Sequence, residues 1–202
     1  MPKLQGYMIT SIIEKTKRNL PHWTANGSIY WITFRLADSI PQSKLNQWKT
    51  EREQWLQLHP QPWDSGTLAE YQHNFGDRLE MWLDRGYGSC SLRNPECREL
   101  VRQSIMKCHG TRHQLHHGVI MPNHVHLLLE PFEGESLAKL LQGLKGGSSF
   151  KCNQISGKTG RFWMQESYDH IVRDRDEYAH FVRYIRSNPL KAKLRPDEYW
   201  LM

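Results

Sequence analysis

The stretch Met-Pro-Asn-His-Val-His-Leu-Leu-Leu-Glu, residues 121–130, decides the fold and indicates the chemistry. Pro122 and Asn123 supply a turn after residues 118–121, and the apolar run 127–129 favours a strand, so the segment predicts an antiparallel hairpin. Successive side chains of a strand point to opposite faces. One face, toward the core, is expected to carry Val125, Leu127 and Leu129, and the opposite face His124, His126, Leu128 and Glu130.

Two imidazoles on one face of a strand form a pair of ligands for a divalent metal ion. The chain has 11 histidines and such pairs arise easily, so an isolated His-x-His pair favours ordinary strand residues over a metal site. The pair gains a chemical meaning only if a third ligand and a reactive group lie beside it.

Composition bounds the class of protein. A chain of 202 residues fits one domain, and its formal charge of +6 favours a polyanionic partner such as nucleic acid. Residues 101–202 hold 15 basic against 10 acidic side chains, whereas residues 1–100 hold 12 against 11, so the excess lies in the half with the histidine pair. A signal peptide and a membrane-spanning run are both missing from the sequence, which predicts a cytoplasmic location.

The cysteines form no Cys-x-x-Cys pair and are expected to be buried free thiols: Cys90, Cys97, Cys108 and Cys152. A zinc-stabilised structural site is one alternative reading of a nearby cluster, although its spacing matches no regular zinc pattern. That cluster comprises Cys108, His109, His113, His116 and His117.

The periodicity predicts an α+β protein. Strands are expected at 28–36, in the hairpin 113–130 and around 170–172; helices are expected at 44–58, 67–83, 95–108, from Ser136 with an interruption at Gly146-Gly147, and from 175 to about 187, closed by Asn188-Pro189. This order favours a ferredoxin-like antiparallel sheet with helices on one face. We interpret residues 1–27 as a basic N-terminal arm, residues 28–202 as the domain, and about 42–85 as a helical insertion.

The predicted last helix carries a further pair of chemically capable side chains. Tyr184 and Asn188 are four residues apart and therefore lie on one helical face. Tyrosine can act as a nucleophile, and a carboxamide oxygen can bind a hard cation. The alternative is that Tyr184 is a core aromatic residue and Asn188 a helix cap before Pro189.

Three motifs together resemble the HUH-type single-tyrosine transposases, and among them the REP-associated tyrosine transposases. They are residues 121–128, residues 163–174 and the run Tyr184-Ile-Arg-Ser-Asn-Pro189, and the resemblance extends from Tyr30 to the C-terminus. It implies a metal-dependent endonuclease and strand transferase acting on single-stranded DNA through a 5'-phosphotyrosine intermediate. By this resemblance His124 and His126 bind Mg²⁺ or Mn²⁺, and Tyr184 is the nucleophile.

Asn188 takes the place of the third ligand by the same resemblance, where related transposases often carry glutamine. Glu130 is the alternative ligand, and Tyr168 the alternative nucleophile. Family members recognise hairpins in repetitive extragenic palindromes with a flanking single strand. The candidate DNA-binding residues are Lys15, Lys17, Arg18 and Trp23 in the arm, and Arg183, Arg186, Lys191, Lys193 and Arg195 around the last helix.

Two points stay open at the level of sequence. The protein is expected to act as a monomer, whereas simple insertion-sequence relatives are dimers that share active sites. The alternative function is a domesticated nucleic-acid-binding module that does not cleave.

Overall fold

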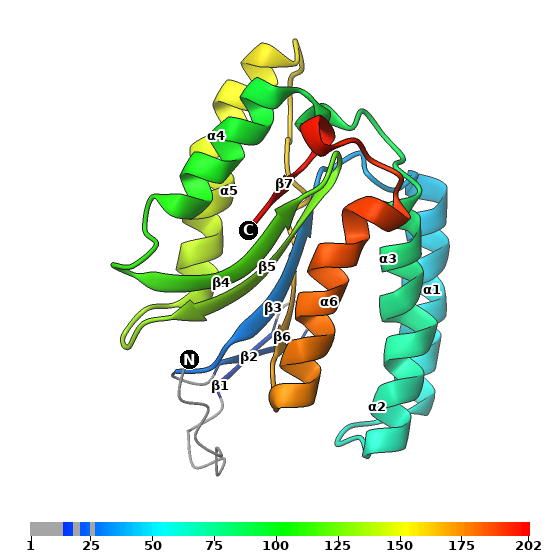
Figure 1. The fold of residues 1–202 in the computed structure, drawn as a ribbon. Coiled ribbons are helices and arrows are strands. Elements are labelled where there is room, and N and C mark those ends of the chain that lie inside the picture. The colour runs from blue at the N-terminus through cyan, green and yellow to red at the C-terminus, as the bar shows by residue number, and fades with distance from the viewer. Residues whose placement is uncertain (1–13, 18–20, 25–26) are drawn as a thin grey trace.

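The computed structural model describes residues 14–17, 21–24 and 27–202, and within them five strands form the main antiparallel sheet (Figure 1). These strands are β3 (Tyr30–Arg35), β4 (His113–Ile120), β5 (His124–Pro131), β6 (Tyr168–Ile171) and β7 (Trp200–Leu201). The sheet order is β6-β3-β5-β4-β7. Its first four strands have the order of a ferredoxin-like fold, which confirms the predicted fold class.

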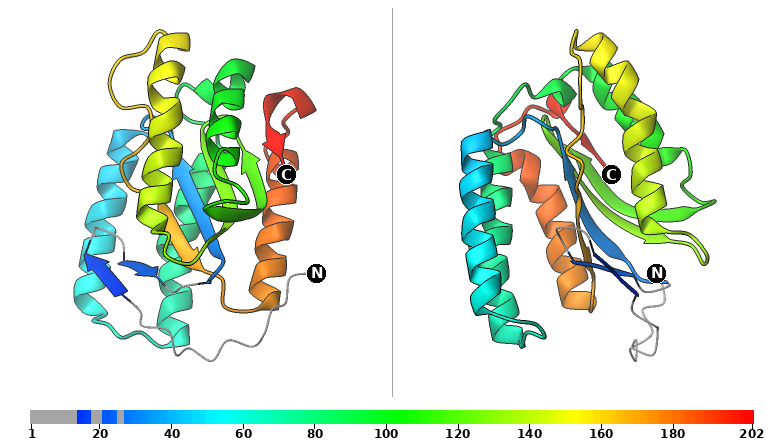
Figure 2. Two further views of the ribbon diagram at one scale, coloured as in Figure 1. Left: turned by 90° about the vertical axis from the view of Figure 1, so that its left-hand side faces the viewer. Right: turned by 180° about the vertical axis from the view of Figure 1, so that it is seen from behind.

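Helices cover both faces of this sheet. On one face lie α4 (Pro95–Met106) and α5 (Leu137–Ile155), the two crossover helices of the ferredoxin-like plan (Figures 1 and 2). The opposite face is covered by α6 (Arg175–Lys191) and the helical insertion (Figure 1). The prediction of helices on one face of the sheet is therefore incomplete, because helices cover the second face as well. The sheet is buried on both faces because Leu127 packs in one apolar cluster and Leu128 in the other.

The predicted insertion is helical and has its own small core. It comprises α1 (Gln42–Leu58), α2 (Ser65–Tyr71), a π-helical turn (Gln72–Gly76) and α3 (Asp77–Asp84). Trp48 and Trp82 are buried in a cluster with Phe75, and the Trp48 indole donates to the Phe75 carbonyl at 3.1 Å. These tryptophans are thus packing residues, and the insertion holds a fixed shape over the sheet.

Helix boundaries follow the predicted caps at the N-terminal ends. Asn94 accepts from the backbone N–H of Glu96 at 2.8 Å ahead of Pro95, and Asp174 accepts from Glu177 N–H at 2.8 Å. Two predicted boundaries are wrong. Helix α5 continues through Gly146-Gly147. Close packing against α4 accounts for the glycine at 147, since a Cβ there would come within 2.8 Å of the Ser104 hydroxyl.

The second wrong boundary is the end of α6. The helix includes Pro189 and ends at Lys191, so Asn188 is an internal helical residue and not a terminal cap. Pro189 cannot donate a backbone hydrogen bond to the preceding turn, but the helix continues beyond it, and the Ala192 N–H donates to the Asn188 carbonyl at 3.0 Å. Asn188 therefore lies one helical turn after Tyr184, on the same face of α6.

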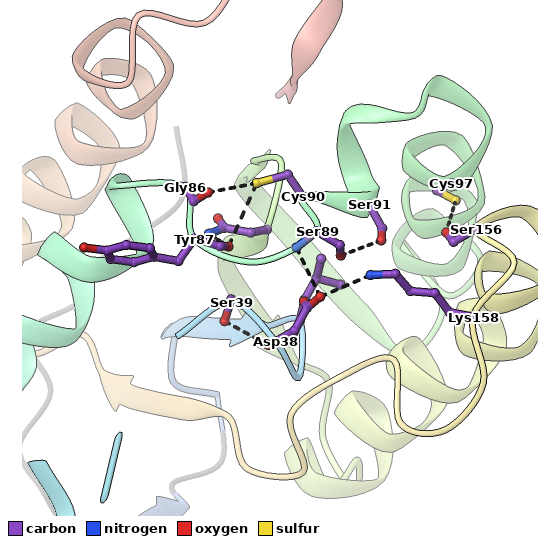
Figure 3. A network of polar contacts seen from close by, with 12 residues as sticks. Asp38, Ser39, Gly86, Tyr87, Ser89, Cys90, Ser91, Cys97, Ser156 and Lys158 are labelled. Atoms are coloured by element: carbon purple, nitrogen blue, oxygen red, sulfur yellow. Dashed lines mark hydrogen bonds and ion pairs between the residues drawn. The ribbon is translucent and has the colours of Figure 1, made fainter. Parts of the chain in front are cut away.

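A loop from the insertion packs against the loop that follows β3. Gly88 has φ +85°, and a Cβ there would lie 2.3 Å from the Asp38 backbone oxygen. The Asp38 carboxylate accepts from the Ser89 N–H at 3.1 Å and pairs with the Lys158 ammonium at 3.1 Å (Figure 3). Short 3₁₀ turns follow at Ser91–Arg93 and, near the C-terminus, at Pro196–Glu198.

The predicted N-terminal arm contains regular structure. Strands β1 (Glu14–Lys17) and β2 (Pro21–Thr24) pair as an antiparallel sheet that is separate from the main five-stranded sheet. All four cysteines are free thiols, but only Cys97 and Cys152 are buried; Cys90 and Cys108 are partly exposed. In the described part of the chain, no helix is long and apolar enough to span a membrane.

Candidate active site

His124 begins β5 with a defined ring orientation. The turn residue Asn123 donates from its amide nitrogen to the carbonyls of Leu83 and Tyr87, both at 3.2 Å. Its amide oxygen therefore faces His124 Nδ1 at 2.7 Å, and Nδ1 must carry the proton of that bond. The lone pair of His124 is consequently on Nε2, which is buried and has no hydrogen-bond partner.

His126 has the same arrangement. Its Nδ1 lies 2.8 Å from the hydroxyl of Thr33, its direct partner in the β3–β5 register. Because that hydroxyl already donates to Glu80 at 3.3 Å, it accepts from Nδ1–H, which leaves the His126 lone pair on Nε2. This Nε2 atom makes no hydrogen bond, although a Glu80 carboxylate oxygen lies 3.4 Å from it. The Trp31 ring stacks on His126 at a centroid distance of 4.8 Å and fixes its plane.

Burial keeps both imidazoles neutral. Each histidine is 0% exposed. Desolvation lowers the pKa of His124 to about 3 and lowers that of His126 well below its usual value, with the neighbouring His124 adding to the effect. Neutral rings with Nδ1–H bound to a second residue and a free Nε2 lone pair are the form in which histidines bind metals.

Tyr184 meets this histidine pair from α6. Its ring stands edge-on to His126 at 5.3 Å between centroids and edge-on to Trp31 at 5.5 Å. The hydroxyl donates to Glu80 at 2.9 Å, and the Lys191 ammonium lies 5.2 Å from the ring centroid. Burial, followed by the negative charge of Glu80, raises the pKa of Tyr184, so the phenol is protonated in this environment.

Glu80 of α3 is a site residue that the sequence reasoning missed. One carboxylate oxygen accepts from Tyr184 and lies 3.4 Å from His126 Nε2, while the other accepts from Thr33 at 3.3 Å. Burial raises its pKa to about 7; nearby Asp84 adds to this, and the bonds from Tyr184 and Thr33 oppose it. The available signal was two acidic residues, Glu80 and Asp84, one turn apart on a helix of the insertion.

Asn188 lies one helical turn beyond Tyr184 and is 1% exposed. Neither atom of its carboxamide has a hydrogen-bond partner. Burial raises the pKa of the neighbouring Asp84 carboxyl, and the charge of Lys191 and the Asn188 amide oppose this rise. Buried polar atoms are almost always paired, so an unpaired carboxamide in this position is available to a ligand. The three orphaned groups, on His124, His126 and Asn188, are chemically a suitable donor set for a divalent cation.

Other metal sites find no support. Among the described residues, no group of three or more His, Cys, Asp or Glu side chains is placed to hold a metal ion, which contradicts a zinc site at residues 108–117. There, His109 Nδ1 instead accepts the backbone N–H of Leu115 at 3.1 Å. Glu130, the alternative third ligand, bonds His116 at 2.9 Å further along β5.

The remaining predicted residues of the domain lie on β6, on α6 and just beyond α6. Tyr168, the alternative nucleophile, donates to Gln72 at 3.0 Å, and it lines with Tyr184 and Glu80 a cavity of about 470 Å³ between the insertion and the sheet. The exposed basic residues on α6 and just beyond it include all five predicted ones, Arg183, Arg186, Lys191, Lys193 and Arg195. Arg195 is already paired with Asp197 and Glu198.

The basic arm is only partly described. Lys15 and Lys17 lie on β1 and Trp23 on β2. Arg18 lies outside the described residues.

Comparison with known proteins identifies the region that carries the site. Residues 91–188 match the family model described as IS200-like transposases. This segment contains the histidine pair, Tyr184 and Asn188, and the match confirms the recognition of a tyrosine transposase from its motifs. No curated protein matches the chain.

One solved structure shares the fold. A structure described as a REP-associated tyrosine transposase bound to a REP hairpin aligns with a TM-score of 0.50 at 15% identity, over 87% of this chain and 74% of that chain. At that identity the likeness shows the fold alone. A putative transposase from Deinococcus radiodurans aligns at 15% identity over 87% of this chain and 98% of that chain, but its TM-score of 0.38 is too low to support the fold further.

Proposed function

Because residues 91–188 match the family model of IS200-like transposases, we propose that this chain cleaves and rejoins single-stranded DNA beside hairpins by attack of Tyr184 on a phosphodiester. The observation that carries the proposal is the contact between Tyr184 of α6 and His126 of β5, with 5.3 Å between their ring centroids. Two residues far apart in sequence, each of the type that this chemistry needs, lie together in a buried site.

The candidate metal ligands are the Nε2 atoms of His124 and His126 and the carboxamide oxygen of Asn188. A divalent ion bound by them, Mg²⁺ or Mn²⁺, would polarise the scissile phosphate and offset the charge that builds on its oxygens. The protein contributes the orientation of these ligands: Asn123 holds one imidazole and Thr33 holds the other. The unpartnered lone pairs support this assignment, and Asn188 is favoured over Glu130 because Glu130 already pairs with His116.

Tyr184 supplies the nucleophile. In the proposed step the phenol gives up its proton, the Tyr184 oxygen forms a bond to phosphorus, the bond from phosphorus to the 3'-oxygen breaks, and that oxygen takes up a proton, so no net proton is gained or lost. The products are a 5'-phosphotyrosine and a free 3'-hydroxyl. The covalent link keeps the energy of the phosphodiester, so rejoining to another 3'-hydroxyl requires no nucleotide cofactor. The cavity beside Tyr184, of about 470 Å³, gives room for the reacting strand.

The proposed partner is hairpin DNA with a flanking single strand, as in the REP hairpin of the related solved structure. Exposed basic residues of α6 and its C-terminal end, Arg183, Arg186, Lys191 and Lys193, are placed to contact phosphates. In the arm, β1 and β2 carry Lys15, Lys17 and Trp23, which are candidates for the single strand. One chain contains both Tyr184 and the histidine pair in contact, which favours action as a monomer.

The test is a covalent adduct. Purified protein is incubated with single-stranded hairpin DNA from its own genome and Mn²⁺ or Mg²⁺, and the products are separated on a denaturing gel. We expect a protein–DNA band with the wild type and none with Tyr184→Phe. Tyr168→Phe is the matched control, because Tyr168 lines the same cavity but does not contact His126. A binding module that does not cleave would retain the hairpin and give no band.

A further inference from the structure

We infer that Glu80 is the positioning residue for the Tyr184 hydroxyl, so that the insertion supplies part of the active site. This role rests on the function proposed above. Glu80 lies outside the segment that matches the transposase family, because α3 belongs to the insertion before residue 91. The site is therefore built from two parts of the chain, one of which the family match does not contain.

The contacts of Glu80 link the nucleophile to the metal-binding strand. The oxygen that accepts from Tyr184 at 2.9 Å is also 3.4 Å from His126 Nε2, and the second oxygen accepts from Thr33 at 3.3 Å. Thr33 in turn holds His126 Nδ1 at 2.8 Å. One carboxylate therefore sets where the Tyr184 oxygen lies relative to the His126 ring.

Helix α3 is held firmly enough to serve this purpose. Trp82 and Leu83 of α3 are buried in the core of the insertion. The Leu83 carbonyl also accepts from the amide of Asn123, the residue that orients His124. Helix α3, which carries Glu80, is thus anchored to the turn that orients His124. The same helix therefore contacts both the Tyr184 hydroxyl and the residue that holds a histidine, and so fixes the position of the nucleophile relative to the ligands.

Two substitutions of Glu80 distinguish a role in positioning the Tyr184 hydroxyl from a requirement for negative charge, because one changes the charge and the other changes the side-chain length. Glu80→Gln keeps the length and an acceptor oxygen for Tyr184 but removes the charge. Glu80→Asp keeps the charge but withdraws the acceptor by one methylene. Misplacing a reacting group by about 1 Å costs roughly 100-fold in rate. We therefore expect Glu80→Asp to be slower by about 10- to 100-fold and Glu80→Gln to stay within about threefold of the wild type.

The experiment measures the single-turnover rate of adduct formation at saturating hairpin DNA, with hairpin affinity measured separately by fluorescence anisotropy. Affinity should be unchanged in both variants, because Glu80 acts through Tyr184. Thermal unfolding confirms that each variant is folded. Asp77→Asn is the matched control: it removes an acidic group from the same helix, where Asp77 is 61% exposed and faces His73.

Each outcome decides the matter. If the wild type forms no adduct, the proposed function fails and the role of Glu80 fails with it. If the wild type is active and Glu80→Asp is equally fast, only the role of Glu80 is overturned. A slow Glu80→Gln beside a fast Glu80→Asp would show that charge matters and position does not. A faster reaction in either variant would show that the carboxylate blocks the site.

Discussion

Replacing Asn188 with leucine is expected to make the protein more stable when no divalent metal is present. The carboxamide is 1% exposed and both of its polar atoms lack a hydrogen-bond partner. A buried polar group left unpaired costs about 1–3 kcal/mol, and leucine has the same branched skeleton of heavy atoms without polar atoms. Loss of the favourable influence of Asn188 on Asp84 takes back part of this gain. We expect a net stabilisation of about 1–2 kcal/mol.

The assay is thermal unfolding in EDTA. For a protein of this size about 1 kcal/mol corresponds to 2–4 °C, so Asn188→Leu should raise the Tm by about 2–8 °C. Asn123→Leu is the matched control, because Asn123 is also 1% exposed but its amide bonds Leu83, Tyr87 and His124. At about 1 kcal/mol for each bond, this variant should be destabilised by about 2–4 kcal/mol.

The opposite signs of the two variants are the essential result. A fall in Tm for Asn188→Leu would mean that the carboxamide makes stabilising bonds in the metal-free protein. Asn188 would then be a structural residue, and its assignment as a ligand kept available for a cation would be refuted.

Three further predictions concern the loop, the histidines and the metal. Gly88→Ala should lower the stability by at least about 1–2 kcal/mol in urea unfolding, because the position needs a positive φ and a Cβ would meet the Asp38 backbone; an unchanged midpoint would contradict the loop geometry. The buried histidines should lower the free energy of unfolding as pH falls below 6.5, because the unfolded chain binds protons there and the folded chain does not. Between pH 7 and 5, the free energy of unfolding of His124→Gln should fall by about 2 kcal/mol less than that of the wild type. Parallel pH–stability curves for the two proteins would argue against a neutral buried ring. Mn²⁺ at 100 times its Kd should stabilise the wild type by about 2.7 kcal/mol and leave His124→Gln unaffected, and an equal shift in both proteins would place the ion elsewhere.

The ferredoxin-like core could be predicted from the sequence because its signals are local. The turn at Pro122-Asn123, the caps at Asn94 and Asp174 and the apolar periodicities each depend on neighbouring residues. The covering of the second face depends on tertiary packing, as does the continuation of α6 through Pro189. Local rules end a helix near a proline, whereas the packed helix tolerates one in its last turn.

The residues of the candidate active site also differ in whether local sequence signals or only tertiary packing reveal them. The histidine pair, Tyr184 and Asn188 follow from motif spacing and family resemblance. Glu80 could not be found in this way, because its role depends on how the insertion folds back over β3 and β5. Nor could the sequence reveal that Asn123 and Thr33 fix both imidazole tautomers. Those bonds depend on the register of β3 with β5 and on the loop after α3.

Mapping the covalent attachment tests the central claim most directly. The wild type is reacted with hairpin DNA, the DNA is trimmed with nuclease, and the protein is digested and analysed by mass spectrometry. We predict a nucleotide remnant linked through a 5'-phosphate to Tyr184 and to no other residue. Attachment at Tyr168, or cleavage of the DNA with no nucleotide linked to the protein, would contradict the account.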